Sequence, residues 1–212
     1  ETAWNIMKEA ALSPIPSPGK SIGGLIGGEA KQLNQLFKAE KNICGTAVSR
    51  GITYAMAVLE VNASMGLIVA APTAGSSGIV PVVVLSLKAE HDFSDSQAVD
   101  ALFNAGAIGY LAMRNATVAG AVGGCQAEVG VASAMAASAA VELMGGSPRQ
   151  CLYAASTVLM NMLGLVCDPV GGLVEYPCQM RNASGVANAM IAAELALAAI
   201  PQLIPFDEML EA

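Results

Sequence analysis

The sequence predicts an all-α fold: a single domain of packed, largely buried helices with glycine-rich functional loops. Hydrophobic residues make up 54% of the 212 residues and charged residues only 13%, which suits a substantial core and is too apolar for a disordered chain. Aromatic residues reach only 4% and few segments alternate between apolar and polar positions, so strand signals are weak. Glycines, prolines and helix-capping patterns divide the apolar stretches into segments of helical length.

The first half of the chain is expected to form five helices. A helix over 2–12 ends where three prolines follow, and a glycine-rich loop over 21–28 precedes the next helix. Pro81 suits the first turn of a helix, and Ser94 with Gln97 three residues later forms a capping box. The expected helices span 2–12, 29–41, 46–64, 77–90 and 94–112.

The second half is expected to form three more helices. Residues 120–124 are expected to form a loop, and the small-residue helix after it closes at Gly145 and Gly146. Ser147 and Pro148 then suit the N-cap and first position of a new helix. The expected helices span 128–144, 147–166 and 182–199, with a briefly extended stretch over 171–178. Because loops carry most functional side chains, the chemistry is expected in the loops at Ser21, Ala71, Gly120 and Pro169.

Composition excludes several partners and compartments. The net charge is −7 and no basic run reaches five residues, so nucleic acid is not an expected partner. The five cysteines are an odd number and lack the short spacing of a secreted disulfide framework, which indicates reduced thiols or metal ligands in the cytoplasm. No basic segment precedes an apolar run at the start, so no signal peptide is expected. Because the chain begins at Glu1, we expect residues 1–212 to be one domain of a longer polypeptide.

Two long uncharged runs raise the question of membrane insertion. Residues 61–87 and 150–167 approach the ~20 residues that span a bilayer. The first run contains Pro72, Gly75 and Pro81 near its middle, which would place a broken polar loop in the hydrocarbon region. The remaining apolar content is mostly alanine, which suits helices that pack closely inside a protein. The sequence therefore favours a buried helical core over a membrane span.

Three of the five cysteines occupy positions typical of a metal centre. Cys125, Cys167 and Cys178 each lie at the end of an expected element and next to glycine or proline, where backbone can approach an inorganic group closely. Cys44 and Cys151 lack such a setting. The spacing is not a zinc pattern of paired cysteines, and three thiolates suit a cuboidal cluster with one open iron. The alternative is that all three are buried core residues, as free cysteines often are.

A hydroxyl-rich loop, APTAGSSG, is the candidate substrate site. Thr73, Gly75, Ser76 and Ser77 precede an expected helix, whose amino end and free amides favour a carboxylate. The alternative is an ordinary helix cap with a tight turn. Arg181 is a second candidate for a carboxylate, because guanidinium binds it with two hydrogen bonds, although a surface ion pair is equally compatible. Other polar residues next to the cysteines are Gln126, Glu128, Asp168, Glu175 and Asn182.

Taken together, these motifs resemble one family. The segments EVNASMGLIVAAPTAGSSGIVP, GAVGGCQAEVGVASAMAA and NMLGLVCDPVGGLVEYPCQMRN are similar to the α subunit or α domain of iron–sulfur-dependent L-serine dehydratase, and the resemblance covers essentially the whole chain. It implies a 4Fe-4S cluster held by Cys125, Cys167 and Cys178, with no pyridoxal phosphate. The open iron would act as a Lewis acid while L-serine loses water and then ammonia to give pyruvate. It also implies an all-helical fold, a β subunit or β domain as partner, and an oligomer in the cytoplasm.

The chain departs from the family pattern at two places, and alternatives stay open. The Ser-Ser-Ser-His-Thr motif of the family's β portion is absent, and Gly23 stands where the family commonly has threonine. The catalytic base is not identified and could come from the partner. One alternative function is a related cysteine desulfidase with the same cluster chemistry. The other is a non-catalytic helical or membrane module whose cysteines only fill the core.

Overall fold

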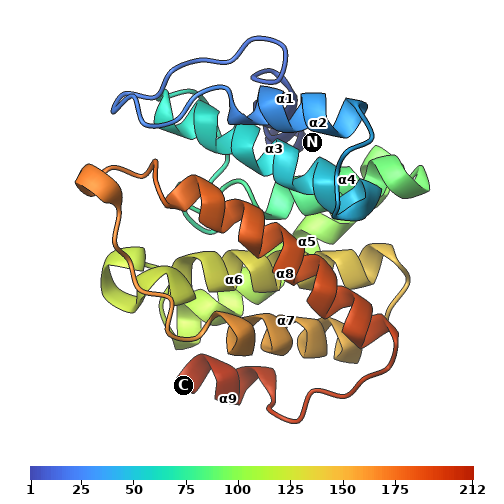
Figure 1. Cartoon of the computed structure of the whole chain (residues 1–212). Coiled ribbons are helices and arrows are strands. Elements are labelled where there is room, and N and C mark those ends of the chain that lie inside the picture. Colours follow the sequence, from blue (N-terminus) through green and yellow to red (C-terminus); the bar gives the residue numbers. More distant parts are fainter.

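The computed structural model describes all residues from Glu1 to Ala212 and confirms the all-α prediction, since it contains no strand. The helices follow one another along the chain, with long connections over residues 13–28, 64–79 and 163–177, and the two ends of the chain lie on different sides of the bundle (Figure 1). The elements are α1 (Thr2–Leu12), α2 (Glu29–Lys38), α3 (Gly45–Ala63), α4 (Val80–His91), α5 (Asp95–Asn115), α6 (Gly120–Leu143), α7 (Pro148–Met162), the 3-10 helix η1 (Val170–Gly172), α8 (Cys178–Leu197) and α9 (Phe206–Glu211).

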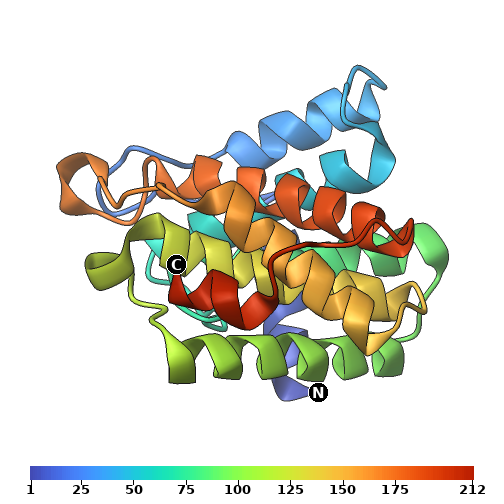
Figure 2. The same ribbon diagram turned by 90° about the horizontal axis from the view of Figure 1, so that it is seen from below.

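Helix α6 is the centre of the core. It packs against α4, α5, α7 and α8, and nearly all its residues after Gly124 are buried. Its alanines, glycines and serines let the neighbouring backbones approach: a Cβ at Gly109 of α5 would lie 2.8 Å from Met135 Sδ, and one at Gly185 of α8 would lie 2.5 Å from Ser133 Oγ. Figure 2 shows α5 below this helix and α8 above it. The expectation that small residues build closely packed central helices is therefore confirmed.

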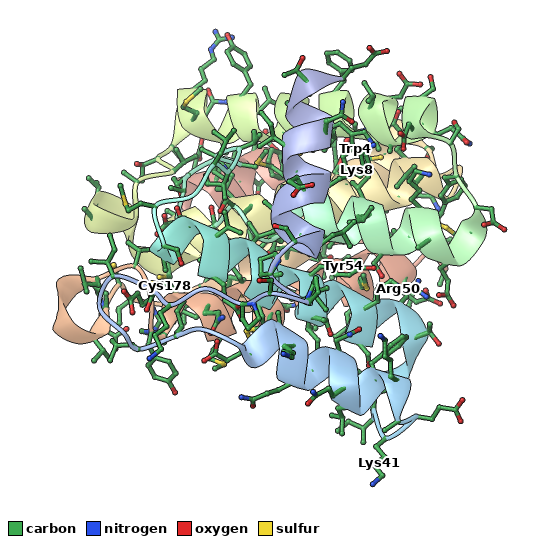
Figure 3. The ribbon with its side chains drawn as sticks, turned by 90° about the horizontal axis from the view of Figure 1, so that it is seen from above. Trp4, Lys8, Lys41, Arg50, Tyr54 and Cys178 are labelled. Atoms are coloured by element: carbon green, nitrogen blue, oxygen red, sulfur yellow. The ribbon has the colours of Figure 1, made fainter.

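Helix α1 closes the other face of the core against α3 and α4. Trp4 is buried and its indole Nε1 donates a hydrogen bond to Asp95 Oδ1 at 3.1 Å, while Lys8 Nζ lies 3.0 Å from Asp95 Oδ2. Figure 3 shows Trp4 and Lys8 side by side on α1. The hydrogen bonds from Lys8 and then Trp4 are the main causes that lower the pKa of Asp95 to about 2. This contact fixes α1 to the first turn of α5.

Several expected helix boundaries are wrong, and local backbone explains each shift. Helix α4 begins at Val80 and not near Ser77, because residues 74–79 form successive turns. Helix α6 begins at Gly120, where a loop was expected, and breaks only at Gly124 (φ 74°, ψ −176°). The capping boxes at Ser94 and Ser147 are confirmed.

The boundaries around the cysteine loop also differ from expectation. Helix α7 ends at Met162, about four residues early, because Leu163 is extended and Gly164 takes a φ of 86°. Helix α8 begins at Cys178 and so includes Arg181, and the stretch expected to be extended contains η1 instead. None of the helices combines the length and hydropathy that a membrane-spanning segment requires.

Candidate functional site

The four loops singled out by the sequence meet at one end of the bundle. The loop before α2, the break in α6 and the segment around η1 lie on the same side in Figures 1 and 2. Hydrogen bonds connect the loop at Ser21 to Glu175, the loop at Thr73 to Glu128, and the loop at Gly75 to Asn182. Residues up to 154 positions apart in the chain are thus held in one site.

The side chain of Glu175 holds the SIGGLIGG loop in place through hydrogen bonds. Its buried carboxylate accepts hydrogen bonds from Ser21 Oγ (2.6 Å), Gly23 N (2.6 Å) and Leu25 N (3.0 Å). Burial acts to raise the pKa of Glu175, but these three donors outweigh it and hold the pKa below its usual value. A Cβ at Gly23 would lie 2.7 Å from Glu175 Oε1, so the loop in this conformation leaves no room for the threonine common in the resembled family.

The APTAGSSG loop is held by its own hydroxyls and by α8. Ser77 Oγ donates to the Ala74 carbonyl at 2.7 Å, and Ser76 Oγ lies 3.0 Å from Thr73 Oγ1. Asn182 receives a hydrogen bond from Gly78 N at 3.1 Å and donates to the Gly75 carbonyl at 2.7 Å. Ser76 and Ser77 are fully buried and Gly75 is buried as well, whereas Thr73 is partly exposed and Ala74 is exposed. The loop is therefore rigid, and its accessible part is the turn at Thr73 and Ala74.

The structure gathers Cys125, Cys167 and Cys178 at this end and leaves the other two cysteines elsewhere. Cys125 is buried, Cys178 is half-buried and Cys167 is exposed. Burial is the main cause that raises the pKa of the Cys178 thiol to about 11, and the charges of the neighbouring thiols and Glu128 act in the same direction. Figure 3 shows Cys178 at the end of the molecule away from Lys41 and Arg50. Cys44 precedes α3, and Cys151 is buried beside Asn104.

Arg181 is the cation of this thiol group. Its Nη1 donates to Cys125 Sγ at 3.1 Å and to the Val166 carbonyl at 2.8 Å, and its Nη2 lies 2.7 Å from Asp168 Oδ1. Burial acts to lower the pKa of Arg181, but the contacts with Cys125 and Asp168 outweigh it and raise the pKa. Arg181 thus contacts the Cys125 thiol as well as pairing with Asp168, and its role as a carboxylate ligand remains a prediction.

Backbone contacts hold the segments of Cys125 and Cys167 together. Gln126 N donates to the Leu165 carbonyl at 2.7 Å, and Gln126 Oε1 accepts from Gly164 N at 2.8 Å. A Cβ at Gly124 would lie 2.9 Å from Leu165 O and 3.5 Å from Cys167 N, so only glycine allows this approach.

The possible metal donors at this end are the three thiols. No three His, Cys, Asp or Glu side chains are close enough to hold one metal ion. The cysteines of a cubane cluster bind separate irons and so stand further apart than the ligands of one ion. The three thiols lie at glycine-rich element ends and interact with one another, and Arg181 donates a hydrogen bond to one of them, so they are the donors available for such a group.

The most informative residues that sequence reasoning missed are two carboxylates. Glu128 and Glu175 were noted only as neighbours of cysteines, without a role. Thr73 Oγ1 donates a short hydrogen bond to Glu128 Oε1, which joins the hydroxyl-rich loop to the first turns of α6. The sequence offered one signal for their importance, because each lies three residues from a candidate cysteine ligand.

The fold and the site together define an all-helical domain whose loops join a group of thiols to a rigid, hydroxyl-lined turn. The chain matches the family model described as serine dehydratase alpha chain over residues 1–212, and it belongs to that family. It is 50% identical over 204 residues to the probable L-serine dehydratase, alpha chain, of Bacillus subtilis (strain 168), covering 96% of this chain and 68% of the relative.

Two further relatives differ in how much of their own length this chain covers. The L-serine dehydratase, alpha chain, of Peptoniphilus asaccharolyticus is 50% identical over 205 residues, covering 97% of this chain and 70% of that protein. The L-serine dehydratase of Streptomyces coelicolor is 39% identical over 196 residues, covering 92% of this chain but 43% of that protein. The family resemblance read from the three motifs is confirmed.

Proposed function

We propose that this chain is the cluster-binding catalytic domain of an iron–sulfur-dependent L-serine dehydratase, which converts L-serine to pyruvate and ammonia. The observation that carries the proposal is the gathering of Cys125, Cys167 and Cys178 beside the APTAGSSG loop. The names of its relatives support serine as the substrate, and those named alpha chain support a β chain as partner. Residues 1–212 would act as one domain, in the reducing environment of the cytoplasm that free thiols require.

In this proposal the three thiols hold a 4Fe-4S cluster, while Arg181 offsets part of the thiolate charge. When bound, the cluster supplies a Lewis-acidic iron that makes the serine hydroxyl a better leaving group. The turn from Thr73 to Gly75, supported by Ser76 and Ser77, receives the substrate carboxylate through backbone amides and hydroxyls. The hydrogen bonds to Asn182 keep this loop in place, so that its amides are oriented before substrate arrives.

The test is to purify the chain anaerobically with its β partner, reconstitute it, and measure iron and sulfide per chain before assaying L-serine turnover. We expect about four of each per chain, consistent with a cubane cluster. Cys167→Ala should lose the full iron and sulfide content. Cys44→Ala, which changes an exposed cysteine outside the site, should keep it. Failure to bind iron after reconstitution, or full retention in Cys167→Ala, would overturn the cluster assignment.

A further inference from the structure

The proposed reaction needs a base for the α-proton of serine, and few side chains at this end can serve. Asp168 is paired with Arg181 at 2.7 Å, and Glu175 is buried with three hydrogen bonds that hold its carboxylate in place. His91, the only histidine, is the last residue of α4, about 18 Å along that helix from the APTAGSSG loop at 1.5 Å per residue. Among the three carboxylates of this chain that lie within three residues of a candidate cysteine, the one that remains is Glu128.

Glu128 lies between the hydroxyl-rich loop and the thiols. Its Oε1 accepts the short hydrogen bond from Thr73 Oγ1, and Thr73 Oγ1 is 3.0 Å from Ser76 Oγ. Both carboxylate oxygens occupy space that glycines leave open: a Cβ at Gly75 would lie 2.7 Å from Oε1, and one at Gly120 would lie 2.5 Å from Oε2. The carboxylate is thus fixed in a slot between two glycines.

The surroundings of Glu128 suit a base more than a structural ion pair. None of the ion pairs in the structure includes Glu128, and its side chain is only partly buried. Its charge interacts with the thiols of Cys125 and Cys178, which places it next to the proposed cluster site. Because Thr73 occupies Oε1, the oxygen left to accept a proton is Oε2.

We propose that Glu128 is the catalytic base that removes the α-proton of serine, with Thr73 as the residue that orients it. This inference rests on the proposed function. Glu128 Oε2 takes the proton from Cα, the C–H electron pair forms the Cα–Cβ double bond, and the Cβ–O bond breaks with its electrons leaving on hydroxide. The proton then passes from Glu128 to that hydroxide, which leaves water, aminoacrylate and a restored carboxylate. Aminoacrylate tautomerises to the imine, and water hydrolyses it to pyruvate and ammonia.

The test compares Glu128→Gln with Glu142→Gln in the reconstituted holoenzyme. Glu142 lies on the same helix, 14 positions along from Glu128 and so about 21 Å away at 1.5 Å per residue. We expect kcat of Glu128→Gln to fall about 10²–10⁴-fold, the usual contribution of a positioned base, with little change in KM. Iron and sulfide per chain and the thermal unfolding midpoint should stay at wild-type values. Formate should partly restore turnover to Glu128→Ala, because it replaces the missing carboxylate.

The results separate this inference from the proposed function. If the reconstituted wild-type protein binds no iron and does not turn over serine, the proposed function is overturned, and this inference with it. An active wild type with kcat of Glu128→Gln within about fivefold would overturn only the role of Glu128 as base, since that is far below the contribution expected of one. Loss of iron from Glu128→Gln but not from Glu142→Gln would also overturn it, because Glu128 would then support the cluster loops. If Glu128→Gln loses kcat while its iron content stays at the wild-type value, and formate restores turnover to Glu128→Ala, the assignment is supported.

Discussion

Replacing Glu175 by glutamine should loosen the SIGGLIGG loop and destabilise the whole domain. The carboxylate accepts three hydrogen bonds, two of them at 2.6 Å, from donors on a loop about 150 residues away in sequence. Glutamine keeps one acceptor oxygen and turns an amide N–H toward at least one backbone donor. Hydrogen bonds to charged groups contribute about 1.5–3 kcal/mol each, so losing one and weakening the others should cost about 2–4 kcal/mol. For a domain of this size that corresponds to about 4–16 °C in thermal midpoint.

Urea unfolding of the apo domain, followed by circular dichroism, measures this cost. Glu9→Gln is the matched control, because Glu9 is exposed and its change should cost less than about 0.5 kcal/mol. The pKa of folded Glu175 lies below the ordinary value of 4.5, so its contribution is present above pH 4.5 and is lost as the pH falls through the folded pKa. The gap between wild type and Glu175→Gln should therefore narrow in acid. An unfolding free energy within 0.5 kcal/mol of wild type at pH 7 would refute the role of Glu175 as the anchor of this loop.

Two other substitutions test the site and its support. Gly124→Ala should lower the free energy of unfolding by about 1–3 kcal/mol and reduce the iron bound per chain, because its Cβ would lie 2.9 Å from Leu165 O. Gly171 has a similar φ but open space around it, so Gly171→Ala should lower the free energy of unfolding by only about 1 kcal/mol. Equal losses of thermal stability and of iron content in the two variants would contradict this. Burial raises the pKa of Glu60, so the folded state holds this proton more tightly than the unfolded chain, and stability should fall as the pH rises from 4.5 through the folded pKa. Glu60→Gln should remove this pH dependence of stability. If the unfolding free energy of Glu60→Gln, measured with urea, changes between pH 5 and 8 as much as that of the wild type, the prediction is wrong.

The helices themselves follow from local sequence. The capping boxes at Ser94 and Ser147 depend only on residues three positions apart, and both form as expected. The small residues of α6 predict close packing whatever their partners, and the helix is central and buried. Such features depend on neighbours within a turn or on side-chain volume, and both can be read from the chain.

The arrangement of the site depended on tertiary structure. Glu175 acquires its role only because the loop at Ser21 is folded over it, and Glu128 only because Thr73 reaches α6. Helix α8 starts four residues earlier than the sequence indicated, with its fifth residue, Asn182, hydrogen-bonded both to the Cys178 carbonyl and to the distant loop at Gly75. The sequence alone determined the helices, the family and the three candidate cysteines. Contacts between distant segments decided that Glu128 lies near those cysteines and that Glu175 anchors a loop. The function of a carboxylate depends on the donors and charges folded around it, and these cannot be read from the chain alone.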